Sequence, residues 1–230
     1  MTALMTPADH KRIEQAIIAA ESRTTGEVVC VLTREVSSYP EIPLVAGVVA
    51  ALALAPAALA LGFDPAWLLS LGGGWRVEHL AAAPDQANAA LWAYIALQTA
   101  LFAVVALLAA IPVIRRLLTP AALKHARVRH AAMQQYLATG LAANVERTGV
   151  VIFTSLDDRQ VEIIADPGIH AACGEAVWKA AVAAVQAGMR AGDPAGGLTR
   201  AVEICGEALA THFPSDGGGP NTLADRLLEL

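Results

Sequence analysis

Two long stretches without any charged side chain interrupt an otherwise amphipathic chain. They cover residues 42–62 and 91–114 and consist mainly of leucine, valine and alanine. A helix rises about 1.5 Å per residue, so the first stretch would be about 31 Å long, which matches a hydrocarbon core of about 30 Å. The pattern predicts two transmembrane helices that form a hairpin, with residues 63–90 as the loop between them.

The composition favours this interpretation over a pair of helices buried inside a soluble protein. Hydrophobic residues make up 56% of the 230 residues and charged residues 16%, against about 45–50% and about 25% in typical globular domains. The excess lies in the two apolar stretches. The rest of the chain is too small to cover two such helices on all sides.

Basic residues are concentrated before the first apolar stretch and after the second. They are Lys11, Arg12, Arg23, Arg34, Arg115, Arg116, Lys124, Arg127 and Arg129. In the loop between the stretches, the single Arg76 is outnumbered by Asp64, Glu78 and Asp85. The positive-inside rule therefore predicts a two-span protein of the cell membrane, with both termini in the cytoplasm and residues 63–90 outside. Membrane lipid is then an expected partner.

The segment before the hairpin predicts a helix followed by a strand. Thr6 and Pro7 are typical of a helix start, and apolar residues such as Ile13 and Ile17 then recur at helical spacing as far as Thr24. Residues 27–33 are rich in β-branched side chains, which predicts a strand.

The segment after the hairpin begins with another predicted helix, which starts at Thr119-Pro120. The residues expected on its inner face are Leu123, Ala126, His130, Met133 and Leu137. His130 is therefore expected to be a core histidine rather than a ligand. Residues 147–154 and 160–165 follow as two strands of a hairpin, and the first of them is apolar on both faces, so both faces should be covered.

Two more helices and a tail complete the chain. Residues 169–189 are expected to form one largely buried helix. The next helix should start with Asp193 as its N-cap and Pro194 at its first position. Its apolar stripe is Leu198, Val202, Cys205 and Leu209. Residues 215–230 are interpreted as a glycine-rich linker and an amphipathic tail that docks on the domain.

These elements predict an α/β fold with a small central β-sheet flanked by helices and split by the inserted transmembrane hairpin. Residues 1–41 form the first part of the domain, residues 42–114 the hairpin, and residues 115–214 the remainder. Two helix–turn–strand units carry Thr-Gly at residues 25–26 and 148–149. This repetition is explained equally well by an ancient duplication and by the same turn solution used twice.

Charge and cysteine content exclude several classes of function. The net charge is −5 with no basic stripe, which argues against a nucleic-acid partner. Cys30, Cys173 and Cys205 form no Cys-x-x-Cys pair and sit at apolar positions, so they are expected to be small core residues in a reducing compartment.

The strongest candidate chemistry is a metal site around Asp166. His170, Glu27 and Asp193 are the residues that could join Asp166 as oxygen or nitrogen ligands. Asp157 and Asp158 lie at the other end of the same strand, more than about 20 Å away, and are interpreted as turn residues. The sequence has no phosphate loop, serine-hydrolase elbow or zinc pattern, so no catalytic residue is identified.

Several segments resemble the TPM domain family. The resemblance is most specific over residues 146–214 and rests on residues 147–152, 158–166 and 192–198, on Trp178 and on His212-Phe213-Pro214. Residues 25–29 and the tail are similar too. In place of the glycine-rich turn that usually follows the third strand, this chain has Asp166-Pro167-Gly168.

The resemblance implies an α/β sandwich and two alternative functions. Some members of the family bind calcium or have weak acid phosphatase activity, and others act in the assembly or repair of membrane complexes. We therefore expect a membrane-anchored module with a non-enzymatic binding or assembly and maintenance role at the cytoplasmic face. Its protein partner would lie in the membrane or at that face. The alternative is a weak, calcium-dependent acid phosphatase.

Overall fold

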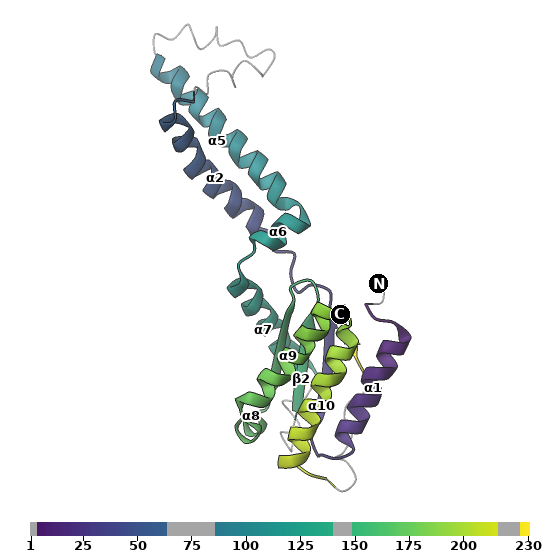
Figure 1. The fold of residues 1–230 in the computed structure, drawn as a ribbon. Helices are drawn as coiled ribbons and strands as arrows, with labels where there is room; N and C mark the ends of the chain where they lie inside the picture. Colours follow the sequence, from purple (N-terminus) through teal and green to yellow (C-terminus); the bar gives the residue numbers. More distant parts are fainter. Residues whose placement is uncertain (1–3, 64–85, 140–148, 216–225) are drawn as a thin grey trace. The chain divides into compact units, whose positions relative to one another are not determined.

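The computed structural model describes residues 4–63, 86–139, 149–215 and 226–230. The chain divides into two compact units (Figure 1). Residues 1–37 and 121–230 make up the α/β unit, and residues 38–120 make up the hairpin unit. The α/β unit is thus assembled from two chain segments that lie on either side of the hairpin in the sequence.

The α/β unit contains a sheet of four strands in the order β3-β2-β1-β4. The strands are β1 (Glu27–Thr33), β2 (Gly149–Ser155), β3 (Gln160–Ala165) and β4 (Leu228–Glu229). β1 runs parallel to β2 along its whole length and parallel to β4 at its end, whereas β3 returns antiparallel to β2. The predicted strands 27–33 and 160–165 are confirmed. Residues 147 and 148 of the other predicted strand lie outside the described residues.

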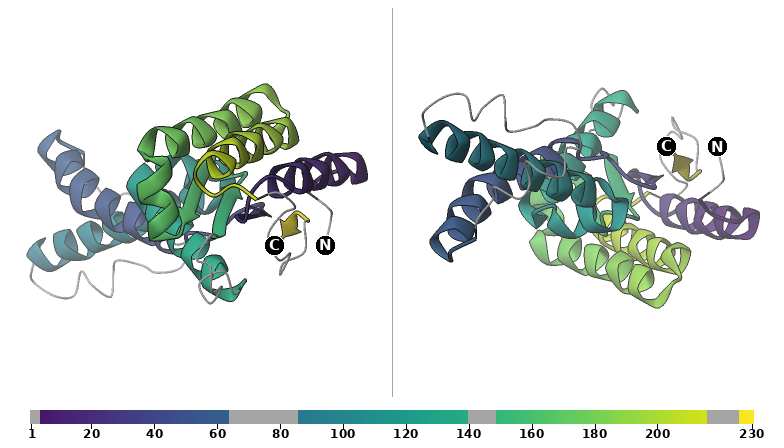
Figure 2. Two further views of the ribbon diagram at one scale, coloured as in Figure 1. Left: turned by 90° about the horizontal axis from the view of Figure 1, so that it is seen from below. Right: turned by 90° about the horizontal axis from the view of Figure 1, so that it is seen from above.

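Helices cover both faces of the sheet. On one face lie α1 (Pro7–Glu21), α8 (Pro167–Cys173), α9 (Glu175–Ala191) and α10 (Pro194–His212). Helix α7 (Ala121–Ala138) covers the other face, as Figure 2 shows. β1 and β2 are buried along their full length, so the prediction of two covered faces is confirmed.

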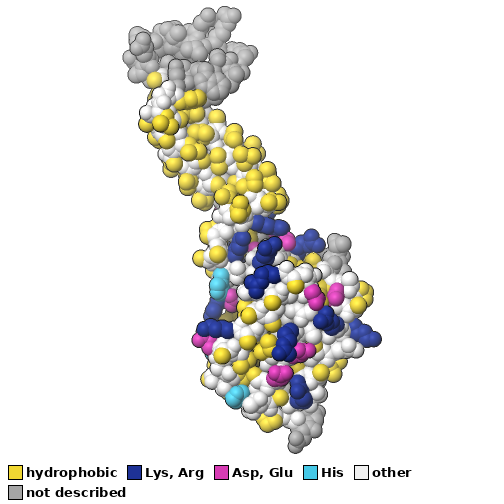
Figure 3. All heavy atoms as spheres, in the orientation of Figure 1, with side chains coloured by type: hydrophobic (Ala, Val, Ile, Leu, Met, Phe, Trp, Pro, Cys, Tyr) yellow, Lys and Arg dark blue, Asp and Glu magenta, His cyan; other side chains and the backbone are white. Residues whose placement is uncertain are grey.

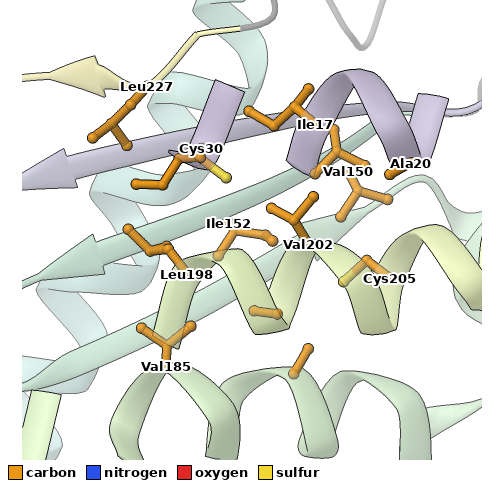
Figure 4. Packing of buried hydrophobic residues seen from close by; sticks show 14 of the residues in the cluster. Ile17, Ala20, Cys30, Val150, Ile152, Val185, Leu198, Val202, Cys205 and Leu227 are labelled. Carbon is orange, nitrogen blue, oxygen red and sulfur yellow. The ribbon is translucent and has the colours of Figure 1, made fainter. Parts of the chain in front are cut away.

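The larger core lies between the sheet and α10. Leu198, Val202 and Cys205 are fully buried and contact side chains such as Cys30 and Ile152, which project from the same face of the sheet (Figure 4). Side chains alternate along a strand, so Val29 and Val31 project from the opposite face toward α7. The predicted stripe of the last helix is confirmed, and Asp193 caps that helix by accepting a hydrogen bond from Gly196 N at 2.7 Å.

The predicted inner face of α7 is wrong. Its buried residues are Val128, Ala132 and Tyr136, whereas His130 is exposed. Apolar residues occur all round this helix, so their spacing alone was compatible with either of two faces being the buried one. The face that packs is the one whose side chains fit against Phe153 and the rest of the β1–β2 surface.

The long helix predicted over residues 169–189 is two helices in the structure. α8 ends at Cys173 and α9 begins at Glu175, with Gly174 between them at φ 76°. Glycine adopts this left-handed conformation without the steric penalty of a side chain, which allows the chain to turn between the helices. The apolar residues continue across the break, so their spacing did not reveal it.

The C-terminal tail docks on the α/β unit as a strand. The N–H of Leu230 donates to the carbonyl of Leu32 at 3.0 Å. Glu229 accepts hydrogen bonds from the backbone N–H groups of Leu4 and Met5, both at 3.0 Å, and pairs with His10 at 2.9 Å. This contact ties the two ends of the described chain together, and we call it the terminal clasp.

The hairpin unit consists of α2 (Glu41–Ala60), α5 (Gln86–Ala110) and the short α6 (Pro112–Leu118). α2 and α5 pack against each other, and Gly47 permits their close approach. A Cβ at Gly47 would lie 2.8 Å from Phe102 Cδ2. Residues 64–85 of the predicted external loop lie outside the described residues.

The second apolar helix ends earlier than predicted. α5 stops at Ala110, and Ile111 is extended with ψ 125° before Pro112 opens α6. Proline disfavours the helical conformation in the residue that precedes it, which accounts for the break. α2 and α5 are nevertheless both long and apolar enough to cross a membrane.

Lowering the pH should release the terminal clasp. Burial alone would raise the pKa of Glu229, but the hydrogen bonds from Leu4, His10 and Met5 together lower it below its usual 4.5. The clasp is therefore stable above about pH 4.5 and weakens as the pH falls through the lowered pKa. NMR of the amide protons of Leu4 and Met5 should show this transition.

The matched control for the clasp is Glu229→Gln. Glutamine keeps the size of the side chain but cannot titrate, so the two amide signals should no longer shift in acid. A transition that persists unchanged in this variant would contradict the role given to Glu229.

Candidate functional site

Asp166 is the centre of the candidate site, at the end of the sheet where β1 and β2 begin. Its side chain is only 4% exposed. One carboxylate oxygen accepts a hydrogen bond from the hydroxyl of Tyr136 at 2.6 Å, and the other accepts one from Gly149 N at 3.1 Å. Asp166 therefore connects the last turn of α7 to the first residue of β2, and neither Tyr136 nor Gly149 was predicted to take part.

Glu27 lies at the same end of the sheet. It is the first residue of β1 and pairs in register with Gly149, whose carbonyl in turn accepts the N–H of Asp166 at 3.1 Å. Glu27 shares the strand parity of Val29, so it lies on the α7 face, where Asp166 meets Tyr136. Glu27 is 5% exposed, so two buried acidic residues flank Gly149 on one face.

The side chains of Asp193 and His170 have other partners than those of Asp166 and Glu27. The far end of α10 is joined to the start of β1 through Thr25 N and the carbonyl of Phe213, at 3.1 Å. Asp193, which caps the N-terminus of the same 19-residue helix, is therefore about 28 Å along α10 from that junction. There it pairs with Arg12 at 3.3 Å. His170 stacks on Trp178, with ring centroids 6.1 Å apart and ring planes 7° from parallel.

Glu27 and Asp166 thus share one end of the sheet, and Asp193 lies far along α10. The backbone N–H of His170 donates to the carbonyl of Asp166 at 2.9 Å, but its ring stacks on Trp178. Among the residues that the structure describes, no group of three or more His, Cys, Asp or Glu side chains is arranged to hold a metal ion. Calcium at this end of the sheet stays a prediction. Tyr136 and Gly149 already use one lone pair on each oxygen of Asp166, so a metal would have to share this carboxylate with the fold.

A second buried carboxylate organises the opposite end of the sheet. Asp158, in the turn between β2 and β3, accepts hydrogen bonds from Ser155 Oγ at 2.7 Å and from Val36 N at 3.2 Å. It therefore holds both the turn and the chain that follows β1. The interpretation of Asp158 as a turn residue agrees with this geometry. Its hydrogen bond with Val36 also joins the turn to a segment that is distant in the sequence.

An ion pair links α7 to the edge strand β3. Glu162 meets His125 Nδ1 at 2.9 Å. Burial raises the pKa of Glu162 above its usual value, although the charges of His125 and Arg129 oppose the shift. The pair fastens α7 to the sheet.

Cys30 and Cys205 are unsuited to nucleophilic chemistry. Cys30, Cys173 and Cys205 all have free thiols. Burial raises the pKa of Cys205 to about 12 and that of Cys30 further still. A thiol needs its thiolate form to react, so both behave as small core residues.

Comparison with protein families bears directly on this arrangement. Residues 115–208, which run from α6 into α10, match the family model described as the TPM domain. The chain contains a TPM domain. The matched residues include Tyr136, Gly149 and Asp166 but not Glu27, which belongs to the strand before the hairpin. The seven-residue pairing of β1 with β2 shows that the folded α/β unit extends beyond the matched segment.

A solved structure supports the fold. The chain is similar to the NMR structure of the BA42 protein from the psychrophilic bacterium Bizionia argentinensis, with a TM-score of 0.55 and 17% sequence identity. The match covers 100% of this chain and 98% of that one. At this identity the likeness concerns the fold alone. A comparison with curated proteins found no match.

Removing the hydroxyl of Tyr136 should destabilise the α/β unit. Tyr136→Phe leaves a buried carboxylate short of one donor, and a hydrogen bond to a charged group contributes about 1.5–3 kcal/mol. We expect the free energy of unfolding to fall by about that amount in denaturant titrations of the detergent-solubilised protein.

Thr211→Val is the matched control for Tyr136→Phe. It also removes one hydroxyl, which donates to the carbonyl of Glu207 at 2.8 Å, but at an exposed site. Its effect should stay within about 0.5 kcal/mol. If the two variants lost equal stability, the hydrogen bond to Asp166 would contribute no more to the free energy of unfolding than an exposed hydrogen bond.

Proposed function

We propose that this chain is a membrane-anchored TPM module that binds a protein partner at the cytoplasmic face of the membrane and has no catalytic activity of its own. The observation that supports it most directly is the hairpin unit, an exposed apolar helix pair inserted between β1 and α7 of one folded domain. The insertion ties the TPM domain to a bilayer through two chain connections rather than one.

The surface of the hairpin unit supports anchoring. Figure 3 shows hydrophobic side chains over α2 and α5 with almost no charge among them. The large exposed apolar residues of these two helices include Leu44, Val45, Val48, Val49, Leu52, Leu54, Leu91, Trp92, Val104, Leu107 and Leu108. Contiguous apolar surface of this extent is unfavourable in water and is typical of contact with lipid.

The surroundings of Asp166, Asp158 and Glu229 support a structural role for these three carboxylates rather than a catalytic one. Asp166 fastens α7 to β2, and Asp158 holds the turn after β2. Glu229 forms the terminal clasp. Each of these carboxylates stabilises the fold through hydrogen bonds, and general acid–base catalysis would require one placed to exchange protons with a substrate.

The orientation is part of the proposal. Arg115 and Arg116 follow α5 immediately, and Lys124, Arg127 and Arg129 continue the basic run in α7. By the positive-inside rule, this distribution supports a cytoplasmic position for the α/β unit and for both termini.

A charge placed in the exposed face of α2 tests the anchoring step. Leu52 is 65% exposed, and a lysine in the middle of a span costs about 2.5–3.5 kcal/mol of insertion free energy. Wild-type protein should remain in membranes after an alkaline carbonate wash, and Leu52→Lys should shift a substantial fraction into the soluble or aggregated pool. Ile18→Lys is the control, because Ile18 is 48% exposed on α1 of the α/β unit.

The same washed membranes test the binding step. After solubilisation in mild detergent, a tagged full-length chain should retain one protein partner at constant stoichiometry in repeated purifications. Release of the wild-type chain by carbonate would contradict the anchoring. A chain that is embedded but purifies alone and hydrolyses phosphate esters would contradict the binding role.

Calcium binding at Glu27 and Asp166 is the second candidate, favoured by two buried acids on one face of the sheet. Calcium takes carboxylate oxygens as ligands and would neutralise both charges. Calcium should then raise the melting temperature of the wild-type protein, and the shift should disappear in Asp166→Asn. Asp193→Asn is the control, because Asp193 lies at the other end of α10. An equal shift in all three proteins would exclude this site.

A further inference from the structure

A pocket with two arginines lies between the turn after β2 and helix α9. It has a volume of about 390 Å³ and is lined by Arg159, Gln186, Met189 and Arg190. This volume is near the lower end of the range of about 300–1,000 Å³ found for small-molecule sites. Gln186 and Arg190 are one helical turn apart, so they project from the same side of α9.

The backbone of Arg159 is unusual. It has φ 52°, and within the described part of the α/β unit it is the only residue other than glycine with a positive φ. The left-handed conformation costs an L-residue with a long side chain about 1–2 kcal/mol, and glycine or asparagine avoids most of that cost. The turn alone therefore does not explain an arginine here, and such strained positions gather at functional sites.

The two arginines also have no acidic partner among the residues that the structure describes. Among the described residues, Arg12 pairs with Asp193 and Arg200 pairs with Glu203. No described carboxylate lies within ion-pair distance of Arg159 or Arg190. The helix dipole of α9 favours a cation in its last turn, which accounts in part for Arg190 but not for Arg159. The pocket thus presents two guanidinium groups without a described counter-charge.

We propose that this pocket binds the phosphate group of a small phosphate-bearing ligand. A guanidinium offers paired N–H donors that match two oxygens of a phosphate, and Gln186 adds an amide donor beside them. Met189 supplies a flexible apolar wall for the part of the ligand next to the phosphate. The site lies at the opposite end of the sheet from Glu27 and Asp166 and goes beyond the proposed function.

The chain connection of this turn makes a lipid headgroup the first candidate for the source of the phosphate. The turn that carries Arg159 is bonded to the chain just after β1, through Leu156 N to Thr33 O at 3.0 Å and Asp157 N to Arg34 O at 2.8 Å. From there the chain continues into the hairpin unit at residue 38. The end of the sheet that carries the pocket is thus the end at which the chain leaves β1 toward the hairpin unit.

Ligand titration of the full-length chain in a nonionic detergent tests the site. The probes are inorganic phosphate, glycerol 3-phosphate and short-chain phosphatidic acid, with short-chain phosphatidylcholine as the zwitterionic comparison. At least one of the first three should bind saturably. Arg159→Asn and Arg190→Gln should each weaken this binding about tenfold or more.

The variants separate loss of binding from loss of folding. Asparagine tolerates the left-handed turn, so Arg159→Asn should unfold no earlier than wild type. Arg200→Gln removes the same charge from an exposed pair and should change affinity less than about twofold.

The outcomes also identify the source of the phosphate. Binding of glycerol 3-phosphate as tight as that of phosphatidic acid would support the site with a soluble phosphate ester as ligand. Binding of phosphatidic acid alone would support it with a lipid headgroup. No saturable binding, or an equal loss in all three arginine variants, would overturn the proposal, whereas a failure of the carbonate wash would not affect it.

Discussion

The parallel pairing of β1 with β2 is the interaction on which the rest of this structure depends. Seven consecutive residue pairs join the strands, from Glu27 with Gly149 to Thr33 with Ser155, although residues 34–148 separate them in the chain. Both strands are buried on both faces, so the pairing aligns the core side chains toward α10 and α7 at once. A register slip of one residue would exchange the two faces, which is why the pairing is strongly specified.

The cost of the insertion between these strands is modest for a physical reason. Closing a loop costs only about 0.6 kcal/mol for each doubling of its length. The hairpin also folds back on itself, since α2 and α5 pack together around Gly47, so the chain leaves and re-enters the α/β unit without a long connection. The α/β unit can therefore carry two apolar helices between its two chain segments and still fold as one unit.

The two ends of the sheet differ in electrostatic character. At the start of β1 and β2, Asp166 and Glu27 are buried, and Asp166 is tied to the fold by Tyr136 and Gly149. At the other end, Asp158 turns inward and Arg159 turns toward the pocket beside Arg190. Inward carboxylates thus stabilise the fold at both ends, whereas the arginines at one end remain accessible to an anion. This division places recognition chemistry away from the acids that the sequence first suggested as ligands.

The sequence by itself determined the features that depend on near neighbours. The bounds of β1 and β3, the capping of α10 by Asp193, its buried stripe and the two apolar helices follow from periods of two or 3.6 residues and from local hydrogen bonds. Only the tertiary structure decided which face of α7 is buried, because that choice depends on the surface of a sheet whose strands are distant in the chain. The same holds for the placement of Glu27 and Asp166 on either side of Gly149, for the docking of the tail as β4 and for the pocket shared by Arg159 and α9. Each joins residues far apart in sequence, and a local pattern carries no information about which distant segment will lie beside it.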